Sequence, residues 1–392
     1  MNSFHRSAIR TVFLLLCIGC GAQTQSPKEQ DADINIPSFR VSPEGAFCSI
    51  GSYDVSPESP DGTKILYMRW NSPPTASSGG DGAVWYCNRD LTGHTKIIDL
   101  ERVRIHNASG IAWVDNHRIQ AYGTYKGDLR GAAVVNINGK IEQGPYNGMD
   151  ILHEAVNGLV PMSSDDDKSR FGKGVFILDA ATGEVRKICD ARSFINYAGR
   201  MPDMRDPAHW RLSHPTWSRD GKYIAVCLEN DSSPYGEYLF SFHPDFSDLV
   251  FFGKKPTHFN WYDDHSSIYG GDRWVQMKDN ALRRWTRDGK WIEDLGGSPA
   301  NHSAMSPDRN WFAGESWYDN DPVLYLYRSG STGKGIVVMS HKFKSVTWEK
   351  RAHVNPAFSC DSKRLYYNRA TSETMNEVWY ADLSGLSATR SK

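Results

Sequence analysis

The sequence predicts an all-β protein, a seven-bladed β-propeller made of four-stranded antiparallel blades. Two observations predict it: a turn motif that recurs along the chain, and a second apolar run after each copy of that motif. The composition agrees, because aromatic residues make up 12% of the 392 residues and 34 glycines suit tight turns. A pair of β-sandwiches is the alternative fold, and the spacing of the motif favours the propeller.

The turn motif is clearest in residues 59–67, 217–225 and 305–313, where Ser, Asp and Gly or a polar residue precede an apolar run. Weaker copies occur at 113–116, 157–158, 261–264 and 358–361. One turn residue represents each copy, and successive turn residues are 42 to 63 positions apart: Asp61, Asp115, Asn157, Asp220, Asp264, Asp308 and Asp361. Seven repeats of this length are typical of propeller blades.

A second run of aromatic or β-branched residues follows each turn and predicts a further hairpin. These runs begin at Val84, Ala133, Val175, Tyr238, Leu282, Val323 and Val378. Two hairpins per repeat make a four-stranded blade. The last repeat stops near Ser384, after its third strand, so we expect the segment 38–51 to complete the final blade and close the ring.

The first residues predict export. Basic residues precede the apolar run 11–18, which is too short to span a bilayer, so residues 1–20 are expected to be a signal peptide of the lipoprotein type. Lipid would be attached at Cys20, and a cleavable signal without lipid is the alternative. Residues 21–36 are polar and are expected to form a flexible tether, and residues 37–392 a single propeller domain. The expected location is the periplasm or cell surface, with the lipid as the membrane anchor.

Charge and cysteine usage exclude other classes of partner and site. The 45 Lys and Arg balance 46 Asp and Glu, so we expect no nucleic-acid partner, and we expect a monomer. Cys48, Cys87, Cys189, Cys227 and Cys360 show no zinc-binding spacing. Cys48 and Cys87 are the first candidates for a disulfide in an exported protein, and thiols buried in strands are the alternative.

Histidines recur at one position of the repeat. His214, His258 and His302 each lie six residues before their turn residue, and Asn355 has the same offset in the last repeat. His353 lies two positions before Asn355, on the same strand face. We therefore expect these side chains to converge at one mouth of the central channel. Clustered imidazoles with an amide indicate a metal or anion site, and hydrogen bonding between neighbouring blades is the alternative.

These motifs resemble the oligogalacturonate lyase family, seven-bladed propellers of the wider TolB-like group that cleave short pectic oligomers by β-elimination. The resemblance is best over residues 205–383 and is carried by the segments 213–218 (SHPTWS), 257–261 (THFNW), 301–308 (NHSAMSPD) and 353–359 (HVNPAFS). It implies that His258 is the catalytic base. It also implies a divalent metal, typically manganese, held by His302 and by a Gln-x-x-His-x-His stretch.

This chain departs from the family in that stretch, which reads KRAHVN over residues 350–355. Lys350 replaces the glutamine and Asn355 replaces the second histidine, so two of the four implied ligands are altered. A family arginine near residues 238–240 is also not evident. The resemblance therefore implies a weakened metal site at His302, His353 and Asn355.

The function that the resemblance implies is β-elimination on an acidic, uronate-containing oligosaccharide, as in pectin degradation. This reaction removes a weakly acidic proton beside a carboxylate and needs cationic charge to stabilise the intermediate. His258 would remove the proton, and His214, Lys350 and Arg351 would orient substrate carboxylates. The alternative is a non-catalytic propeller that binds a glycan or a protein through Trp and Tyr side chains at the same mouth.

Overall fold

The computed structural model describes residues 35–73, 79–104, 108–204, 206–230, 232, 236–271, 281–297, 301–316, 323–331, 335–340, 353–372 and 374–386. They belong to one compact unit, Ile34–Lys392. The predicted signal peptide with Cys20 and the predicted tether as far as residue 34 lie outside the described residues, as do Lys350 and Arg351. Within the described ranges, no helix has both the length and the apolar character needed to cross a membrane.

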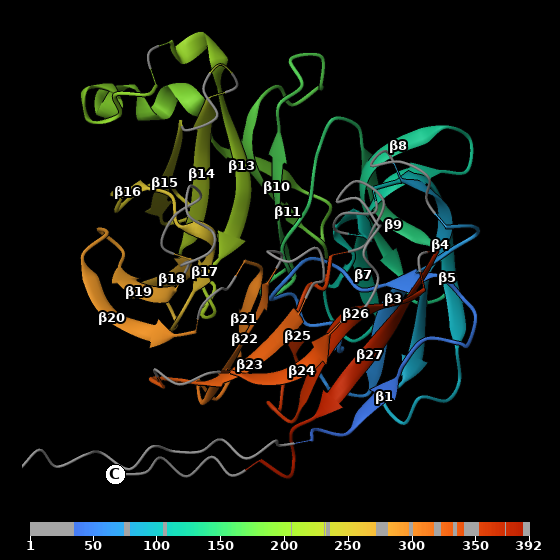
Figure 1. Cartoon of the computed structure of the whole chain (residues 1–392). Coiled ribbons are helices and arrows are strands. Elements are labelled where there is room, and N and C mark those ends of the chain that lie inside the picture. Colours follow the sequence, from blue (N-terminus) through green and yellow to red (C-terminus); the bar gives the residue numbers. More distant parts are fainter. Residues whose placement is uncertain are drawn as a thin grey trace, which may run out of the picture. The chain divides into compact units, whose positions relative to one another are not determined.

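The described strands form six hydrogen-bonded sheets. One of these sheets contains the first two blades, which are joined by a single pair, Glu101 and Thr124, so that seven antiparallel blades follow one another around a common centre (Figure 1). The first three blades contain β2 (Cys48–Ser49), β3 (Lys64–Trp70), β4 (Gly80–Asn88) and β5 (Thr95–Val103); β6 (Ala112–Trp113), β7 (Arg118–Tyr125), β8 (Leu129–Asn136) and β9 (Ile141–Tyr146); and β10 (Leu159–Ser164), β11 (Gly174–Asp179) and β12 (Val185–Cys189). In the third blade, the innermost position is occupied by an isolated β-bridge between Asp150 and Ser163 in place of a regular strand.

The remaining blades each have four strands. They contain β13 (Trp210–Trp217), β14 (Ile224–Asn230), β15 (Glu237–Phe242) and β16 (Val250–Lys254); β17 (Thr257–Trp261), β18 (Ser267–Gly271), β19 (Leu282–Thr286) and β20 (Trp291–Gly296); β21 (Ser303–Met305), β22 (Trp311–Ser316), β23 (Val323–Arg328) and β24 (Ile336–Ser340); and β25 (Ala357–Phe358), β26 (Arg364–Ser372), β27 (Met375–Asp382) and β1 (Ser38–Arg40). The predicted all-β propeller, closed by an N-terminal strand, is confirmed.

The strand β1 closes the ring, and the backbone N–H groups of Val41 and Ser42 continue its hydrogen bonds to Val378 of β27. Ser38, Phe39 and Arg40 pair with the outer edge of β27, and Figure 1 shows β1 in blue beside β27 in red. The rest of the segment expected to complete the final blade does not do so, because Cys48 and Ser49 form β2, the innermost strand of the first blade. The chain thus passes from the outside of the last blade to the centre of the first.

The recurring turn is stabilised by its own side chains. In four copies a serine hydroxyl donates a hydrogen bond to the aspartate two positions later, at 2.6 to 2.8 Å: Ser59 to Asp61, Ser218 to Asp220, Ser306 to Asp308 and Ser359 to Asp361. The next residue has a left-handed backbone, which explains Gly62 and Gly221 at that position. The turn therefore connects the innermost strand to the second strand of each blade.

Neighbouring blades bury each other's faces. Cys227 and Leu239 of the fourth blade share an apolar cluster with Phe259 and Trp261 of the fifth. Indole nitrogens also join blades, because Trp261 Nε1 donates to Thr216 O at 3.1 Å. Each blade thus depends on the next one for its hydrophobic burial.

The cysteines are free thiols in the described part of the chain. Cys48 and Cys87 share one buried apolar cluster but are not bonded to each other, so the disulfide expected between them is wrong. Burial raises the pKa of both thiols to about 12, which keeps them protonated. They act as small apolar side chains at the contact between the first and last blades.

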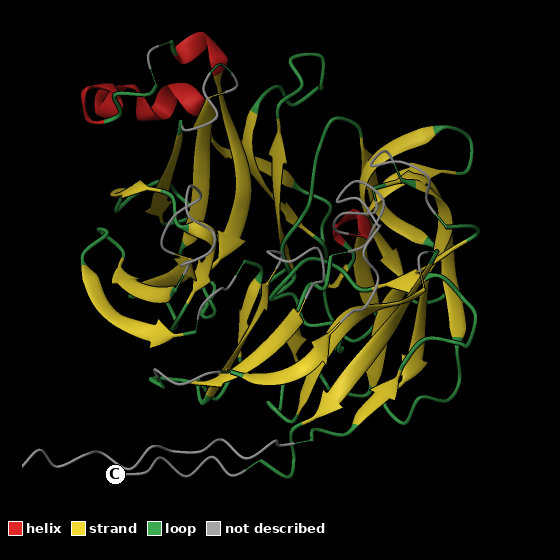
Figure 2. Cartoon of the chain, in the orientation of Figure 1, coloured by secondary structure: helices red, strands yellow, loops and turns green. Residues whose placement is uncertain are grey.

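Among the described residues, helical structure is confined to short 3-10 segments, coloured red in Figure 2. Ala191–Arg200 and Pro207–His209 lie between the third and fourth blades, and they meet the start of β13. Asp190 caps the first segment by accepting a hydrogen bond from the backbone N–H of Arg192. Phe194 is buried there against Phe240, with ring centroids 4.4 Å apart.

Candidate functional site

The side chains at the shared histidine position are placed by irregular backbone. His214, His258 and Asn355 have φ values of 52°, 47° and 46°, in the left-handed region that such residues rarely adopt. The pairing register shifts beside His214 in β13 and beside His258 in β17, as at a β-bulge. A bulge redirects a side chain out of the regular alternation of a strand. These three side chains, with His302, line one cavity of about 60 Å³.

The structure brings three of the predicted histidines together. The ring centroids of His258 and His302 are 4.2 Å apart, and those of His302 and His353 are 4.5 Å apart. His302 and His353 are only 1% and 0% exposed. These two imidazoles are therefore shielded from solvent.

Glu315 completes this cluster, and the sequence analysis missed it. The carboxylate oxygen Oε1 of Glu315 is in direct contact with His302 Nδ1 and lies 3.7 Å from His353 Nδ1. The two Nδ1 atoms are themselves 3.1 Å apart. Glu315 is on β22, the strand next to β21, where its backbone N–H donates to His302 O and its carbonyl accepts from Asn301 N.

The charge of Glu315 is maintained although the side chain is fully buried. Burial alone raises the pKa of this carboxyl, but the charge and hydrogen bond of His302, with those of His353, outweigh burial and hold the pKa far below its usual value. An ionised carboxylate thus faces two imidazole nitrogens in a site without bulk water. Burial and His302 lower the pKa of His353 to about 4, so this ring is neutral at pH 7.

This donor set fits a divalent metal. One ligand atom each from His302, Glu315 and His353 lie within 4.8 Å of one another. Two imidazoles and one carboxylate are ligands that zinc, manganese or iron accept. A bound cation would neutralise the buried charge of Glu315 and would be coordinated by the two imidazole nitrogens that converge on it.

The side chain of Asn355, the third predicted metal ligand, forms a hydrogen bond to the backbone of the first blade. Its side-chain Nδ2 donates to Gly51 O at 2.9 Å, which ties the last blade to the first. Asn368 plays a related part, because its Nδ2 donates to His353 O at 2.7 Å and its Oδ1 accepts from Ile50 N. These amides fix the backbone that carries His353.

Tyr53 is a further residue that the sequence analysis missed. Its ring stacks on His302 with centroids 4.9 Å apart and meets the edge of His258 at 5.2 Å. Burial raises the pKa of Tyr53 well above its usual value, so the phenol stays protonated. Tyr53 lies eight positions before Asp61, and no repeated spacing marks it in the sequence.

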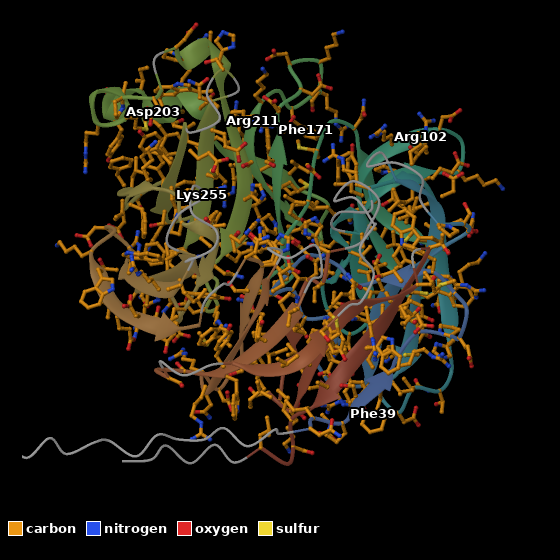
Figure 3. All side chains as sticks on the ribbon, in the orientation of Figure 1. Phe39, Arg102, Phe171, Asp203, Arg211 and Lys255 are labelled. Atoms are coloured by element: carbon orange, nitrogen blue, oxygen red, sulfur yellow. The ribbon has the colours of Figure 1, made fainter. Side chains whose placement is uncertain are left out.

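His258, the predicted base, is neutral at pH 7. Burial first, and then the charges of His302 and Lys255, lower the pKa of this imidazole well below its ordinary value. Lys255, labelled in Figure 3, lies in the link between β16 and β17 and is paired with Glu237 at 3.1 Å. It is a buried positive charge close to His258.

His214 belongs to a neighbouring group of polar side chains. Its Nδ1 lies 2.8 Å from Ser213 Oγ, and Ser213 donates to Glu229, which is paired with Arg211 at 2.7 Å. Burial and Lys255 lower the pKa of His214 to about 4. His214 lines the histidine cavity but does not join the His302, Glu315 and His353 group.

Fold and site together define a seven-bladed β-propeller with a buried His/Glu/His cluster in its channel. Among solved structures, this chain is similar to oligogalacturonate lyase of Vibrio parahaemolyticus, with a TM-score of 0.63 and 15% identity over 91% of this chain and 96% of that one. It is similar as well to an oligogalacturonate lyase in complex with manganese, with a TM-score of 0.61 and 15% identity over 89% of this chain and 94% of that one.

A third similar structure is the β-propeller domain of Cps50 (Swd1) from Myceliophteria thermophila, with a TM-score of 0.52 and 10% identity over 88% of this chain and 99% of that one. Identities this low show a shared fold. No family model matches this sequence, and no curated protein matches it.

Proposed function

We propose that this protein is a metal-dependent lyase that cleaves an acidic, uronate-containing oligosaccharide by β-elimination. The observation that carries the proposal is the position of His258, a neutral imidazole whose ring lies 4.2 Å from that of His302 in the His/Glu/His group. A base beside a cation is the arrangement that proton removal next to a carboxylate requires. The solved lyase with manganese supports the choice of metal.

In this proposal His258 takes the proton from the carbon beside the uronate carboxylate. The electron pair of the broken C–H bond forms the double bond, the neighbouring C–O bond breaks, and the leaving oxygen takes a proton. A divalent metal held by His302, Glu315 and His353 would supply positive charge to the carboxylate. Lys255 adds a second positive charge nearby, and Tyr53 is a protonated group in the same cavity that can serve the leaving oxygen.

The positions of the expected substrate-binding residues complete the proposal. His214 lines the same cavity as His258, and it is the one expected substrate-binding residue that lies within the described ranges. Lys350 and Arg351, which precede His353 in the chain, are proposed to meet further carboxylates of the substrate. Asn355 is proposed to support the metal site through the backbone of the last blade.

Metal analysis and a product assay test the function together. Purified protein is reconstituted with Mn²⁺ or Zn²⁺, its bound metal is measured by mass spectrometry, and oligogalacturonate is incubated with it while the absorbance of the unsaturated uronate is followed. We expect about one metal per chain and a rise in absorbance that a chelator prevents. Protein that binds metal and yields no product from any polyuronate would contradict the lyase.

The second candidate is a propeller that binds a glycan or a protein without catalysis. The observation that favours it is the hydrogen bond from Asn355 to Gly51 O. The resemblance implies a metal-binding histidine at position 355, but here the side chain at this position holds two blades together. This candidate predicts protein without bound metal and without product, but with saturable binding to an immobilised acidic glycan. His258→Ala should then leave the binding unchanged.

We also propose that the protein acts outside the cytoplasm as a monomer anchored by a lipid on Cys20. The support is the sequence of residues 1–20 alone. Cys20→Ala should release the protein from the membrane fraction into the soluble fraction of the host that makes it. Unchanged membrane association of that variant would contradict the lipid anchor.

A further inference from the structure

A second cavity lies among the innermost strands, on the side of the recurring turns. No residue that lines it also lines the histidine cavity. Its volume is about 190 Å³, which is room for about six waters at ~30 Å³ each. Two of its lining residues, Glu154 and Cys360, are exposed, so the cavity is open to solvent.

A guanidinium group and a carboxyl group, those of Arg219 and Glu154, line this cavity and form no ion pair with each other. Arg219 forms no ion pair with the described residues, and the contact recorded for its guanidinium is a 3.5 Å one from Nη2 to Met305 O. Glu154 also has no ion pair within the described ranges. Both side chains belong to the lining of this one cavity. A ligand that carries both an ammonium and a carboxylate group would give each of these side chains a charged partner.

The carboxyl group of Asp54 argues against two simpler ligands for this cavity, a divalent cation and a plain anion. Its Oδ2 accepts from Asn260 Nδ2 and Tyr269 Oη, both at 2.6 Å, and its Oδ1 accepts from Met305 N at 3.1 Å. With these oxygens used, and a guanidinium in the same cavity, the site is poor in free oxygen ligands for a divalent cation. The two carboxyl groups of Asp54 and Glu154 also disfavour a plain anion.

The rest of the wall is apolar. Trp217, Met305 and Phe358 line the cavity and are at most 5% exposed. Trp217 is held in place because its Nε1 donates to Leu159 O at 3.0 Å. Apolar walls with a few polar groups are typical of sites for small organic molecules.

We propose that this cavity binds a free α-amino acid with an apolar side chain. Arg219 takes the carboxylate, Glu154 takes the ammonium group, and the side chain lies against Trp217, Met305 and Phe358. Binding gives Arg219 and Glu154 each an oppositely charged group of the ligand as a partner, and the ammonium group favours the ionised form of Glu154. The site is separate from the proposed metal and base, so it does not depend on the proposed lyase activity.

Calorimetry tests the charge requirement on the ligand side. The full protein is first screened by thermal shift against each of the twenty standard amino acids, and L-leucine with the best of them is then titrated. Leucine methyl ester, which lacks the carboxylate charge, and N-acetyl-leucine, which lacks the ammonium charge, are titrated in parallel. We expect saturable binding of the free amino acid and binding at least about tenfold weaker for both derivatives. Absence of binding by every amino acid overturns the proposal, and so does equal binding of either derivative.

Variants and a chemical reporter test the location. Arg219→Gln and Glu154→Gln should each weaken binding by about tenfold or more, whereas the exposed Arg102→Gln should bind normally. Bound amino acid should also slow the modification of Cys360 by N-ethylmaleimide, followed by mass mapping of the peptide that contains it. Full binding by both cavity variants, or unchanged modification of Cys360 at saturation, would place the ligand elsewhere and overturn the proposal.

Discussion

Glu315 is the residue on which metal binding should depend most strongly. It contributes the negative charge of the His/Glu/His group, and no water competes for it because it is fully buried. Glu315→Gln keeps the shape of the side chain and removes its charge. We expect the affinity for Mn²⁺ or Zn²⁺ to fall at least about tenfold, measured by competition with a chromogenic chelator. Glu293→Gln on the outer strand β20 is the matched control and should bind metal like the wild type.

His258 should separate chemistry from metal binding. It is not a member of the metal group, so His258→Ala should retain bound metal and its melting temperature. Loss of a general base should lower the rate of elimination by about 10²- to 10⁴-fold, measured by the absorbance of the unsaturated product. A variant that loses metal in parallel with activity would show that His258 holds the cluster together instead.

Glu154 is expected to lower stability at alkaline pH. Although Glu154 is exposed at the mouth of its cavity, desolvation of its carboxyl group, and then the charge of Asp54, raise the pKa of Glu154 to about 7, above its unfolded value of 4.5. The folded protein therefore loses stability as pH rises from about 4.5 to 7, because ionisation becomes harder in the folded state than in the unfolded one. Glu154→Gln removes this effect, so its melting temperature should exceed that of the wild type at pH 8. The difference should shrink toward pH 5, and a constant difference would contradict the assigned pKa.

The histidine cluster could be predicted from the sequence to a useful extent. His258, His302 and His353 could be grouped because the repeat gives each of them a position relative to a turn. Glu315 and Tyr53 could not, because each occurs once and no second blade carries the same residue type at the same position. A buried acid in a strand is recognised only when its neighbours across the blade are known.

The single strand β1 should control solubility. It covers the edge of β27, and Phe39, labelled in Figure 3, stacks on Tyr380 with ring centroids 5.2 Å apart. Deleting residues 37–41 exposes that edge, so we expect a lower melting temperature and aggregation during expression. Deleting residues 21–34 is the control and should change neither, because this segment is polar. A soluble 37–41 deletion with an unchanged melting temperature would contradict the role of β1 in closure.

Most of the other strands could be predicted from the repeated sequence pattern, and a few could not. The apolar runs from Val84 to Val378 all fall within third strands, because hydrophobic patterning is repeated in every blade. The division of the segment 38–51 between two blades could not be predicted, since both parts look like strands and the break between them depends on contacts more than 300 residues away. The choice between a disulfide and buried thiols for Cys48 and Cys87 could not be made from the sequence, because residue spacing does not give bonding geometry, and the structure shows buried thiols.

At the scale of the whole molecule, each blade is held by its neighbours on both sides. Trp261 links the fifth blade to the fourth through its indole hydrogen bond to Thr216 O. Trp261→Phe keeps the ring in the core and removes this bond, at a cost of about 1 kcal/mol. We expect one shifted unfolding transition that circular dichroism and fluorescence report together, because a closed ring has no end blade to unfold first. Two separate transitions would show that the blades unfold independently.

The pairing of β1 with β27 also has a consequence for the order of events during synthesis. β1 precedes every other described strand and leaves the ribosome first, whereas β27 is the last described strand to emerge. For most of translation the first strand has no partner, and the growing sheets present two unsatisfied edges at once. Contacts between such distant segments form slowly. The ring should therefore be most vulnerable to proteases and to chaperone capture in the interval just before β27 is completed, and nascent chains stalled before and after that point would differ sharply in their resistance to a protease.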